Sequence, residues 1–239
     1  MTGAQIEGIV FDKDGTLFDF NATWGTWARG MMEAETGGDA KALSALAAAL
    51  GYDTEADRFR PESIVIASTA GDVADRIMSV LPDLDRTALL QRMNKAAAEV
   101  IQIEAVPLKD YFAKLRALGL QLGIATNDAE APARRHLDRA GVIALFDFIA
   151  GYDSGHGAKP EAGQLFAFCT QTGLDPAECL MVGDSTHDLH AGRAAGMRTV
   201  GVLTGPAPHQ ELAPLSDVVL ENIGAIPEWL HVQGLLRHA

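Results

Sequence analysis

The N-terminal segment Asp12-Lys13-Asp14-Gly15-Thr16 places two carboxylates directly after a short apolar run. Residues two apart in an extended chain share a face, so Asp12 and Asp14 are expected to project together. Neighbouring carboxylates repel each other unless a cation or a proton lies between them. Oxygen ligands of this kind suit Mg²⁺, which takes one or two carboxylates and keeps several waters. The segment therefore predicts a Mg²⁺ site, although an Asp-Gly turn at a strand end has the same composition.

Three further polar segments could join this site. Thr126-Asn127-Asp128 offers a hydroxyl and backbone N–H groups that can hold phosphate oxygens, but a Thr-Asn pair also caps helices. Lys159 could neutralise a phosphate, although a Lys-Pro pair is common in surface turns. Asp184, in Gly183-Asp184-Ser185, could complete a metal site, and Asp188 could orient a metal-bound water or the lysine, although Asp184 or Ser185 could instead cap a helix. Each of these segments, taken alone, is open to both interpretations.

The elements that must position these segments are predicted from apolar runs. Six runs have the composition of short strands, and they cover residues 6–11, 120–125, 146–150, 179–182, 199–203 and 217–220. Helical patterns such as 108–118 and 161–172 lie between them. This alternation predicts an α/β core with a Rossmann-like, doubly wound parallel sheet. Ligands of such sheets bind beyond the carboxyl ends of the strands, where the polar segments fall.

Residues 18–103 follow a different pattern. Leu43, Leu46 and Leu50 lie at helical spacing before Gly51, and no convincing strand is indicated, although Ile64-Val65-Ile66 is ambiguous. We therefore expect a catalytic α/β core formed by residues 1–17 and 106–239, and an inserted α-helical domain formed by residues 18–105.

Composition limits the classes of function. The chain has 239 residues, 48% of them apolar and 21% charged, which is typical of a globular protein. Its net charge of −13 argues against nucleic acid and anionic membranes as partners. Cys169 and Cys179 are expected to be free thiols in a reducing compartment. No secretory segment or membrane span is indicated, so a cytoplasmic location is expected, while the oligomeric state is not indicated.

Together, the four polar segments resemble the motifs of the haloacid dehalogenase (HAD) superfamily. Residues 11–17 match the first motif, Thr126 the second, Lys159 the third, and Gly183-Asp184-Ser185 with Asp188 the fourth. The resemblance covers essentially the whole chain, since the helical insert corresponds to that family's α-helical cap. Within the family, the sequence is most similar to the phosphoglycolate phosphatase-like and β-phosphoglucomutase-like branches.

The resemblance implies a mechanism for the first motif. Asp12 would be the nucleophile and would form an aspartyl phosphate. Asp14 would protonate the leaving oxygen and then activate water. The carboxylates of Asp12 and Asp184 and the backbone carbonyl of Asp14 would hold Mg²⁺. Dehalogenases of this fold lack a carboxylate at the position of Asp14, so this residue favours phosphate chemistry.

The resemblance also assigns roles to the remaining motif residues. Thr126 and Lys159, helped by backbone N–H groups near Asn127, would bind the phosphoryl oxygens, and Lys159 would neutralise charge during catalysis. Asp188 and Thr16 would lie behind the metal ligands, where Asp188 would orient a metal-bound water or the lysine and the Thr16 hydroxyl would tie the turn of the first motif.

The expected activity is that of a Mg²⁺-dependent phosphatase acting on a small phosphorylated metabolite, either phosphoglycolate-like or a sugar phosphate. A phosphomutase of the β-phosphoglucomutase type is the alternative, since it would need the same core residues. A non-catalytic scaffold is disfavoured because Asp12, Asp14, Lys159 and Asp184 are all present.

Residues of the insert are expected to select the leaving group. The candidates are Phe20, Trp24, Arg58 and Arg60. Trp24 also belongs to an apolar stripe that could pack inside the insert, and the two arginines could be solvated in a loop.

Overall fold

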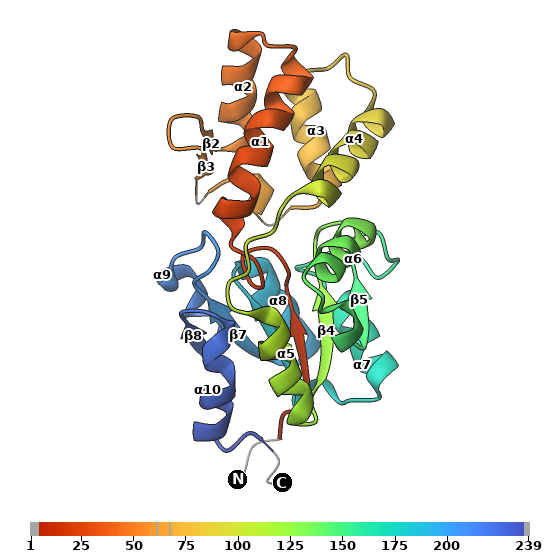
Figure 1. Ribbon diagram of the computed structural model, residues 1–239, viewed down its shortest axis with the longest axis vertical. Helices are drawn as coiled ribbons and strands as arrows, with labels where there is room; N and C mark the ends of the chain where they lie inside the picture. Colours follow the sequence, from red (N-terminus) through yellow and green to blue (C-terminus); the bar gives the residue numbers. More distant parts are fainter. Residues whose placement is uncertain (1–4, 61, 67, 237–239) are drawn as a thin grey trace.

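The computed structural model describes residues 5–60, 62–66 and 68–236, apart from the side chain of Thr26, and its core is a six-stranded parallel sheet (Figure 1). The strand order is β5-β4-β1-β6-β7-β8. The strands are β1 (Gly8–Phe11), β4 (Gln121–Ala125), β5 (Phe148–Ala150), β6 (Cys179–Gly183), β7 (Arg198–Val202) and β8 (Val218–Leu220). The predicted α/β class is confirmed, since helices cover both faces of this sheet.

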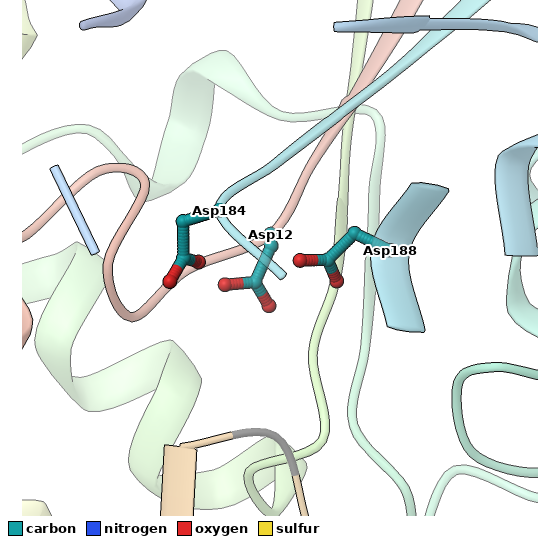
Figure 2. A group of neighbouring side chains, drawn as sticks. All are labelled: Asp12, Asp184 and Asp188. Carbon is teal, nitrogen blue, oxygen red and sulfur yellow. The ribbon is translucent and has the colours of Figure 1, made fainter. Parts of the chain in front are cut away.

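The sheet order brings distant polar segments to one edge. Strand β1 lies between β4 and β6, and Phe11 is in register with Ile124 on one side and Val182 on the other. Asp12 and Asp184 therefore leave adjacent strands almost side by side, and Asp188 approaches from the following helix (Figure 2).

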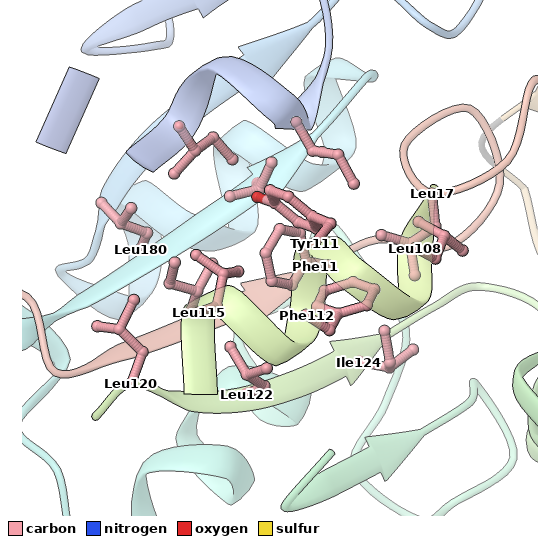
Figure 3. Packing of buried hydrophobic residues seen from close by; sticks show 14 of the residues in the cluster. Phe11, Leu17, Leu108, Tyr111, Phe112, Leu115, Leu120, Leu122, Ile124 and Leu180 are labelled. Carbon is pink, nitrogen blue, oxygen red and sulfur yellow. The ribbon is translucent and has the colours of Figure 1, made fainter. Parts of the chain in front are cut away.

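One face of the sheet packs against α5 (Leu108–Ala117), α6 (Glu130–Arg139) and α10 (Ile226–Val232). Figure 3 shows the centre of this layer, where Phe11 meets Tyr111 and Phe112 of α5. The rings of Phe11 and Phe112 are edge to face, with centroids 5.4 Å apart. This packing fixes β1 immediately before Asp12.

The other face packs against α7 (Gly163–Thr172) and α8 (Thr186–Ala195). Side chains alternate between the faces, so Val10 joins this cluster while its neighbours join the other. The shorter elements of the core are η2 (Ile143–Leu145), η3 (Pro176–Glu178), α9 (His209–Leu212) and η4 (Ile223–Ala225).

The insert forms a second, separate hydrophobic cluster. Its helices are α1 (Phe20–Thr36), α2 (Ala40–Leu50), α3 (Ala70–Val80) and α4 (Arg86–Glu99). Each begins at a side-chain cap, and the capping residues are Asp19, Asp39, Thr69 and Asp85.

One short feature of the insert was not predicted from the sequence, and another settles a segment that the sequence left ambiguous. A small antiparallel hairpin pairs β2 (Tyr52–Asp53) with β3 (Arg58–Phe59), where no strand is predicted. Two-residue strands are too short to show an alternating pattern. The ambiguous triplet Ile64–Ile66 forms the 3₁₀ turn η1.

Two connecting segments join the insert to the core, and they pair with each other. Asp19 N donates to Ile103 O at 2.8 Å, and Ala105 N donates to Leu17 O at 2.8 Å. The end of α4 also rests on α6, where Arg139 Nη1 donates to Ala98 O at 3.1 Å. In the described part of the chain, no helix has the length and apolar character that crossing a bilayer requires.

Candidate active site

Asp12 lies at the tip of β1 and forms a close pair with Lys159. Lys159 Nζ lies 2.5 Å from Asp12 Oδ1 and 2.7 Å from Asp188 Oδ1, and it also donates to Ala125 O at 2.6 Å. The lysine is 4% exposed and Asp12 is 8% exposed. The structure thus brings the predicted nucleophile and the predicted phosphate-binding lysine into direct contact.

The charges of this pair are strongly perturbed. Burial raises the pKa of Asp12 to about 7, against the lowering effect of Lys159. Burial lowers the pKa of Lys159, but the charges of Asp12 and Asp188 outweigh it, so the net pKa is raised and the lysine stays protonated. A further cation near Asp12 would favour the ionised carboxylate that a nucleophile requires.

Three buried carboxylates gather at this point (Figure 2). Oxygens of Asp12, Asp184 and Asp188 all lie within 4.8 Å of one another. Asp184 Oδ2 is buried and has no hydrogen-bond partner, while Thr16 Oγ1 donates to Asp184 Oδ1 at 3.3 Å. Burial, reinforced by the charges of Asp12 and Asp188, raises the pKa of Asp184 well above its usual value.

The surroundings of this cluster fit a divalent cation. A Cβ at Gly15 would lie 2.3 Å from Asp184 Oδ2, and one at Gly205 would lie 1.7 Å from the same oxygen. Gly15 also has a φ of +80°, which other residues resist. A side chain at either glycine would therefore collide with the Asp184 carboxylate. An unpartnered buried carboxylate oxygen beside two others is the donor set that Mg²⁺ accepts.

Asp188 contacts both the start of α8 and Lys159. Its Oδ2 accepts from Ser185 N at 3.0 Å and from Ser185 Oγ at 2.7 Å, which closes a capping box at the start of α8. Its Oδ1 holds Lys159. The Asp188 side chain thus caps α8, holds Lys159 and supplies one of the three clustered carboxylates.

The carboxylate of Asp14 belongs to a second network of contacts. Lys13 Nζ lies 2.6 Å from Asp14 Oδ2 and 3.3 Å from Asp128 Oδ2, and Trp24 Nε1 donates to Asp14 Oδ1 at 2.9 Å. Lys13 is fully buried and also lies 3.1 Å from His136 Nδ1. Asp14, the predicted general acid and base, is therefore held by Trp24 of the insert and by Lys13, its neighbour in sequence.

Burial governs the protonation of this second network. Burial raises the pKa of Asp128 to about 6, although Lys13 opposes the shift. Burial and the charge of Lys13 lower the pKa of His136 to about 4, so its ring is neutral near pH 7. His136 Nε2 lies 2.8 Å from Ala97 O, and because a carbonyl only accepts, the ring proton is assigned to Nε2.

The second motif shapes the opposite wall of the site. Asn127 Nδ2 donates to Lys159 O at 2.9 Å, and Lys159 N donates to Asn127 Oδ1 at 2.9 Å, so the amide fixes the lysine's backbone. Thr126 is 2% exposed, and its Oγ1 accepts from Asp128 N at 3.0 Å. Both residues line the cleft that contains Asp12.

The insert covers this cleft with Phe20 and Trp24, two of its four predicted contacts. Arg58 and Arg60 are exposed on and beside β3 and do not line the cleft. The hairpin turns both side chains to solvent, so the sequence-based expectation that they contact the substrate gains no support.

Sequence reasoning did not assign roles to Lys13, Asp128 or His136. A lysine between two acids in the first motif was a visible signal, but two of its partners, Asp128 and His136, lie more than 100 residues away in the chain. His136 falls on an ordinary amphipathic helix, where a histidine carries no functional signal of its own.

Comparison with known proteins identifies the family of the chain. The family model described as haloacid dehalogenase-like hydrolase matches residues 6–196. A phosphoglycolate phosphatase from Nitrosospira multiformis is 31% identical over 192 residues, which are 80% of each chain. The pyrophosphatase PpaX from Bacillus velezensis is 25% identical over 98% of this chain and 100% of its own.

A solved structure also shares the fold. CbbY from Rhodobacter sphaeroides in complex with phosphate has a TM-score of 0.68 at 22% identity, covering 92% of this chain and 96% of that one. The chain belongs to the haloacid dehalogenase-like hydrolase family, as the resemblance implied. Its class of enzyme is phosphoric monoester hydrolase, a phosphatase of the HAD type.

Proposed function

We propose that the protein is a Mg²⁺-dependent phosphatase that transfers the phosphoryl group of a small metabolite to Asp12 and then to water. One observation carries the proposal: the tips of β1 and β6 unite three buried carboxylates with Lys159, which lies 2.5 Å from Asp12. Positioning and charge neutralisation are the main demands of phosphoryl transfer, and this arrangement supports both.

In the first step, a carboxylate oxygen of Asp12 attacks phosphorus and the bond from phosphorus to the ester oxygen breaks. Asp14 gives its proton to that oxygen, which leaves as an alcohol. Lys159 and the backbone N–H groups near Asn127 bind the phosphoryl oxygens. In the second step, Asp14 takes a proton from water, whose oxygen attacks phosphorus and releases Asp12.

Asp12, Asp184 and the backbone carbonyl of Asp14 would hold Mg²⁺, with the Asp188 carboxylate close enough to join or to orient them. When bound, Mg²⁺ supplies positive charge that offsets the phosphoryl oxygens and the clustered carboxylates. The partnerless Asp184 Oδ2 is the feature of this chain that most directly supports a cation there.

Asp14 must exchange a proton in both steps, and its surroundings support that role. Trp24 and Lys13 each contact one of its carboxylate oxygens. These contacts fix the orientation of the side chain toward the cleft, which it lines together with Asp12. We propose that residues 18–105 act as a cap that excludes water from this exchange. Buried, free Cys169 and Cys179 are compatible with the proposed cytoplasmic location.

The test is Asp12→Asn, which keeps the shape of the side chain and removes its nucleophilic charge. We expect release of phosphate from p-nitrophenyl phosphate to fall by about 10³-fold or more, with an unchanged circular dichroism spectrum. Normal turnover by this variant would refute the role of Asp12.

Two further measurements complete the test. Excess chelator should stop the wild-type activity, and added Mg²⁺ should restore it; full activity in chelator would refute the metal requirement. If the enzyme isomerises a hexose phosphate without releasing phosphate, the proposed hydrolysis is wrong and the protein is a phosphomutase.

A further inference from the structure

The cleft above Asp12 has two chemically different ends. It is a cavity of about 100 Å³ that lies between the sheet edge and the insert. Its charged residues all come from the core, and they surround the position proposed for the phosphoryl group. The insert supplies the opposite wall, which the leaving group must contact.

That opposite wall is apolar. The side chains that form most of it are Phe20, Trp24, Trp27, Val65, Val73 and Met93. The rings of Trp24 and Trp27 meet at 87° with centroids 5.2 Å apart, and they form an aromatic corner. Ser68 and Asn94 are the polar residues that the described insert adds to the cleft, and Asn94 already hydrogen-bonds Tyr152.

The basic residues of the insert lie elsewhere. Arg29, Arg86 and Arg92 pair with Asp57, Asp75 and Glu35 respectively. The others are exposed and do not line the cleft: Lys41, Arg58, Arg60, Arg76 and Lys95. Among the described residues, the insert therefore offers no cation to a bound leaving group.

Lys13 does not supply a cation to the leaving group either. Its Nζ lies 5.6 Å from the centroid of the Trp24 ring, and Asp14 and Asp128 already neutralise it. It is fully buried and does not line the cleft. Lys159 is committed to Asp12 and Asp188 at the phosphoryl end.

A leaving group with its own carboxylate or phosphate would thus bring an unpaired negative charge against an apolar wall. Burying an unpaired charge is strongly unfavourable, and the nearby carboxylates of the core would add repulsion. An apolar leaving group would instead remove its own surface and that of the wall from water.

We propose that the substrate is a phosphate monoester of an uncharged, predominantly apolar alcohol or phenol, which the wall formed by the insert selects. This inference rests on the proposed phosphatase function and makes it more specific. It predicts that the glycolate and phosphate leaving groups of phosphoglycolate and pyrophosphate are poor fits.

The experiment compares kcat/KM of the wild-type enzyme with Mg²⁺ on benzyl phosphate, phosphoglycolate, glycerol 3-phosphate and pyrophosphate. The first three are phosphate esters of primary alcohols, so the leaving group differs mainly in charge and polarity. We expect benzyl phosphate to exceed each of the others by about tenfold or more, since a single methylene in an apolar pocket is worth about that factor.

Val65→Arg tests whether the wall of the insert causes this preference. Val65 is only partly buried, so the variant should fold, and the new charge should shift the ratio of kcat/KM toward phosphoglycolate by about tenfold or more. Val80→Arg is the matched control, because Val80 is also partly buried in the insert but does not line the cleft. For Val80→Arg, the ratio of kcat/KM for benzyl phosphate to that for phosphoglycolate should equal the wild-type ratio.

The possible failures are distinguishable. Equal or higher kcat/KM with any of the three polar substrates would overturn the substrate class and leave the phosphatase function standing. An unchanged ratio in folded Val65→Arg would overturn the role of the wall. No turnover of any of these substrates, nor of p-nitrophenyl phosphate, would overturn the proposed function itself.

Discussion

Lys13 is a buried cation between two carboxylates, and replacing it by Met should destabilise the protein in a pH-dependent way. Methionine has nearly the same length and is apolar, so Lys13→Met removes the charge with little change in packing. The substitution leaves Asp14 and Asp128 without the ammonium group that lies 2.6 Å and 3.3 Å from them.

The expected magnitude follows from the burial of these groups. Lys13 is 0% exposed, and the side chains of Asp14 and Asp128 are 15% and 12% exposed, so solvent screens the network only weakly. Removing one partner of such a buried pair typically costs about 3–5 kcal/mol in the free energy of unfolding. We expect a loss in this range at pH 8.

The loss should be smaller at lower pH. Burial already raises the pKa of Asp128 from 3.8 to about 6, and without the charge of Lys13 it should rise further. A carboxyl whose pKa is raised on folding contributes stability below its unfolded pKa and loses it as the pH rises through its folded pKa. At pH 5.5 the variant can protonate Asp128, so we expect its loss to be about 1–3 kcal/mol less than at pH 8.

The assay is urea unfolding of both proteins at pH 5.5 and pH 8. Arg86→Met is the matched control, since Arg86 forms an exposed pair with Asp75 and its removal should not shift the urea midpoint measurably. An equal loss for Lys13→Met at both pH values would refute the electrostatic account and point to packing alone. A loss below about 1 kcal/mol at pH 8 would refute the network's contribution to stability.

Three further predictions concern the metal and the insert. Mg²⁺ should raise the thermal midpoint more at pH 8 than at pH 5.5, because burial raises the pKa of Asp12 to about 7 and protons compete with the metal at low pH. Asp184→Asn should abolish this shift, and an equal shift at both pH values in the wild type would contradict the assignment. Trp24→Phe should lower kcat by about 10- to 100-fold without unfolding the protein, because it removes one hydrogen bond to the carboxylate of Asp14; an unchanged kcat would exclude a positioning role. Replacing Arg58 and Arg60 together by Ala should leave KM unchanged, since both are exposed away from the cleft; a rise in KM would show that they reach the substrate.

Much of the core fold could be read from local patterns. The apolar run at 120–125 matches β4 (Gln121–Ala125) to within one residue, and the run at 199–203 matches β7 (Arg198–Val202) equally well. Buried parallel strands are continuous apolar segments bounded by polar turns, so their positions are visible in the sequence. The hairpin of β2 and β3 was missed because two residues per strand leave no pattern to detect.

The chemistry of the site was only partly visible. Sequence motifs indicated Asp12, Asp184 and Lys159, because Asp12 and Asp184 follow apolar runs, Lys159 follows a Gly-rich loop, and each carries a group suited to phosphate or metal. The sequence suggested that Asp188 orients either a metal-bound water or the lysine, and the structure places Asp188 Oδ1 2.7 Å from Lys159 Nζ, within the carboxylate cluster. That contact depends on the capping box that orients the first turn of α8.

The sequence alone determined the family, the doubly wound core and the residue types at the strand ends, because these are properties of local segments. Only the tertiary structure decided which groups face one another. The pairing of β1 with β6 brings Asp12 to Asp184, and the packing of α6 under the insert brings His136 to Lys13. The burial of Lys13 and the apolar wall of the cleft each depend on residues that are far apart in the chain. Long-range packing therefore decides which charges are paired, which are buried and which face the substrate.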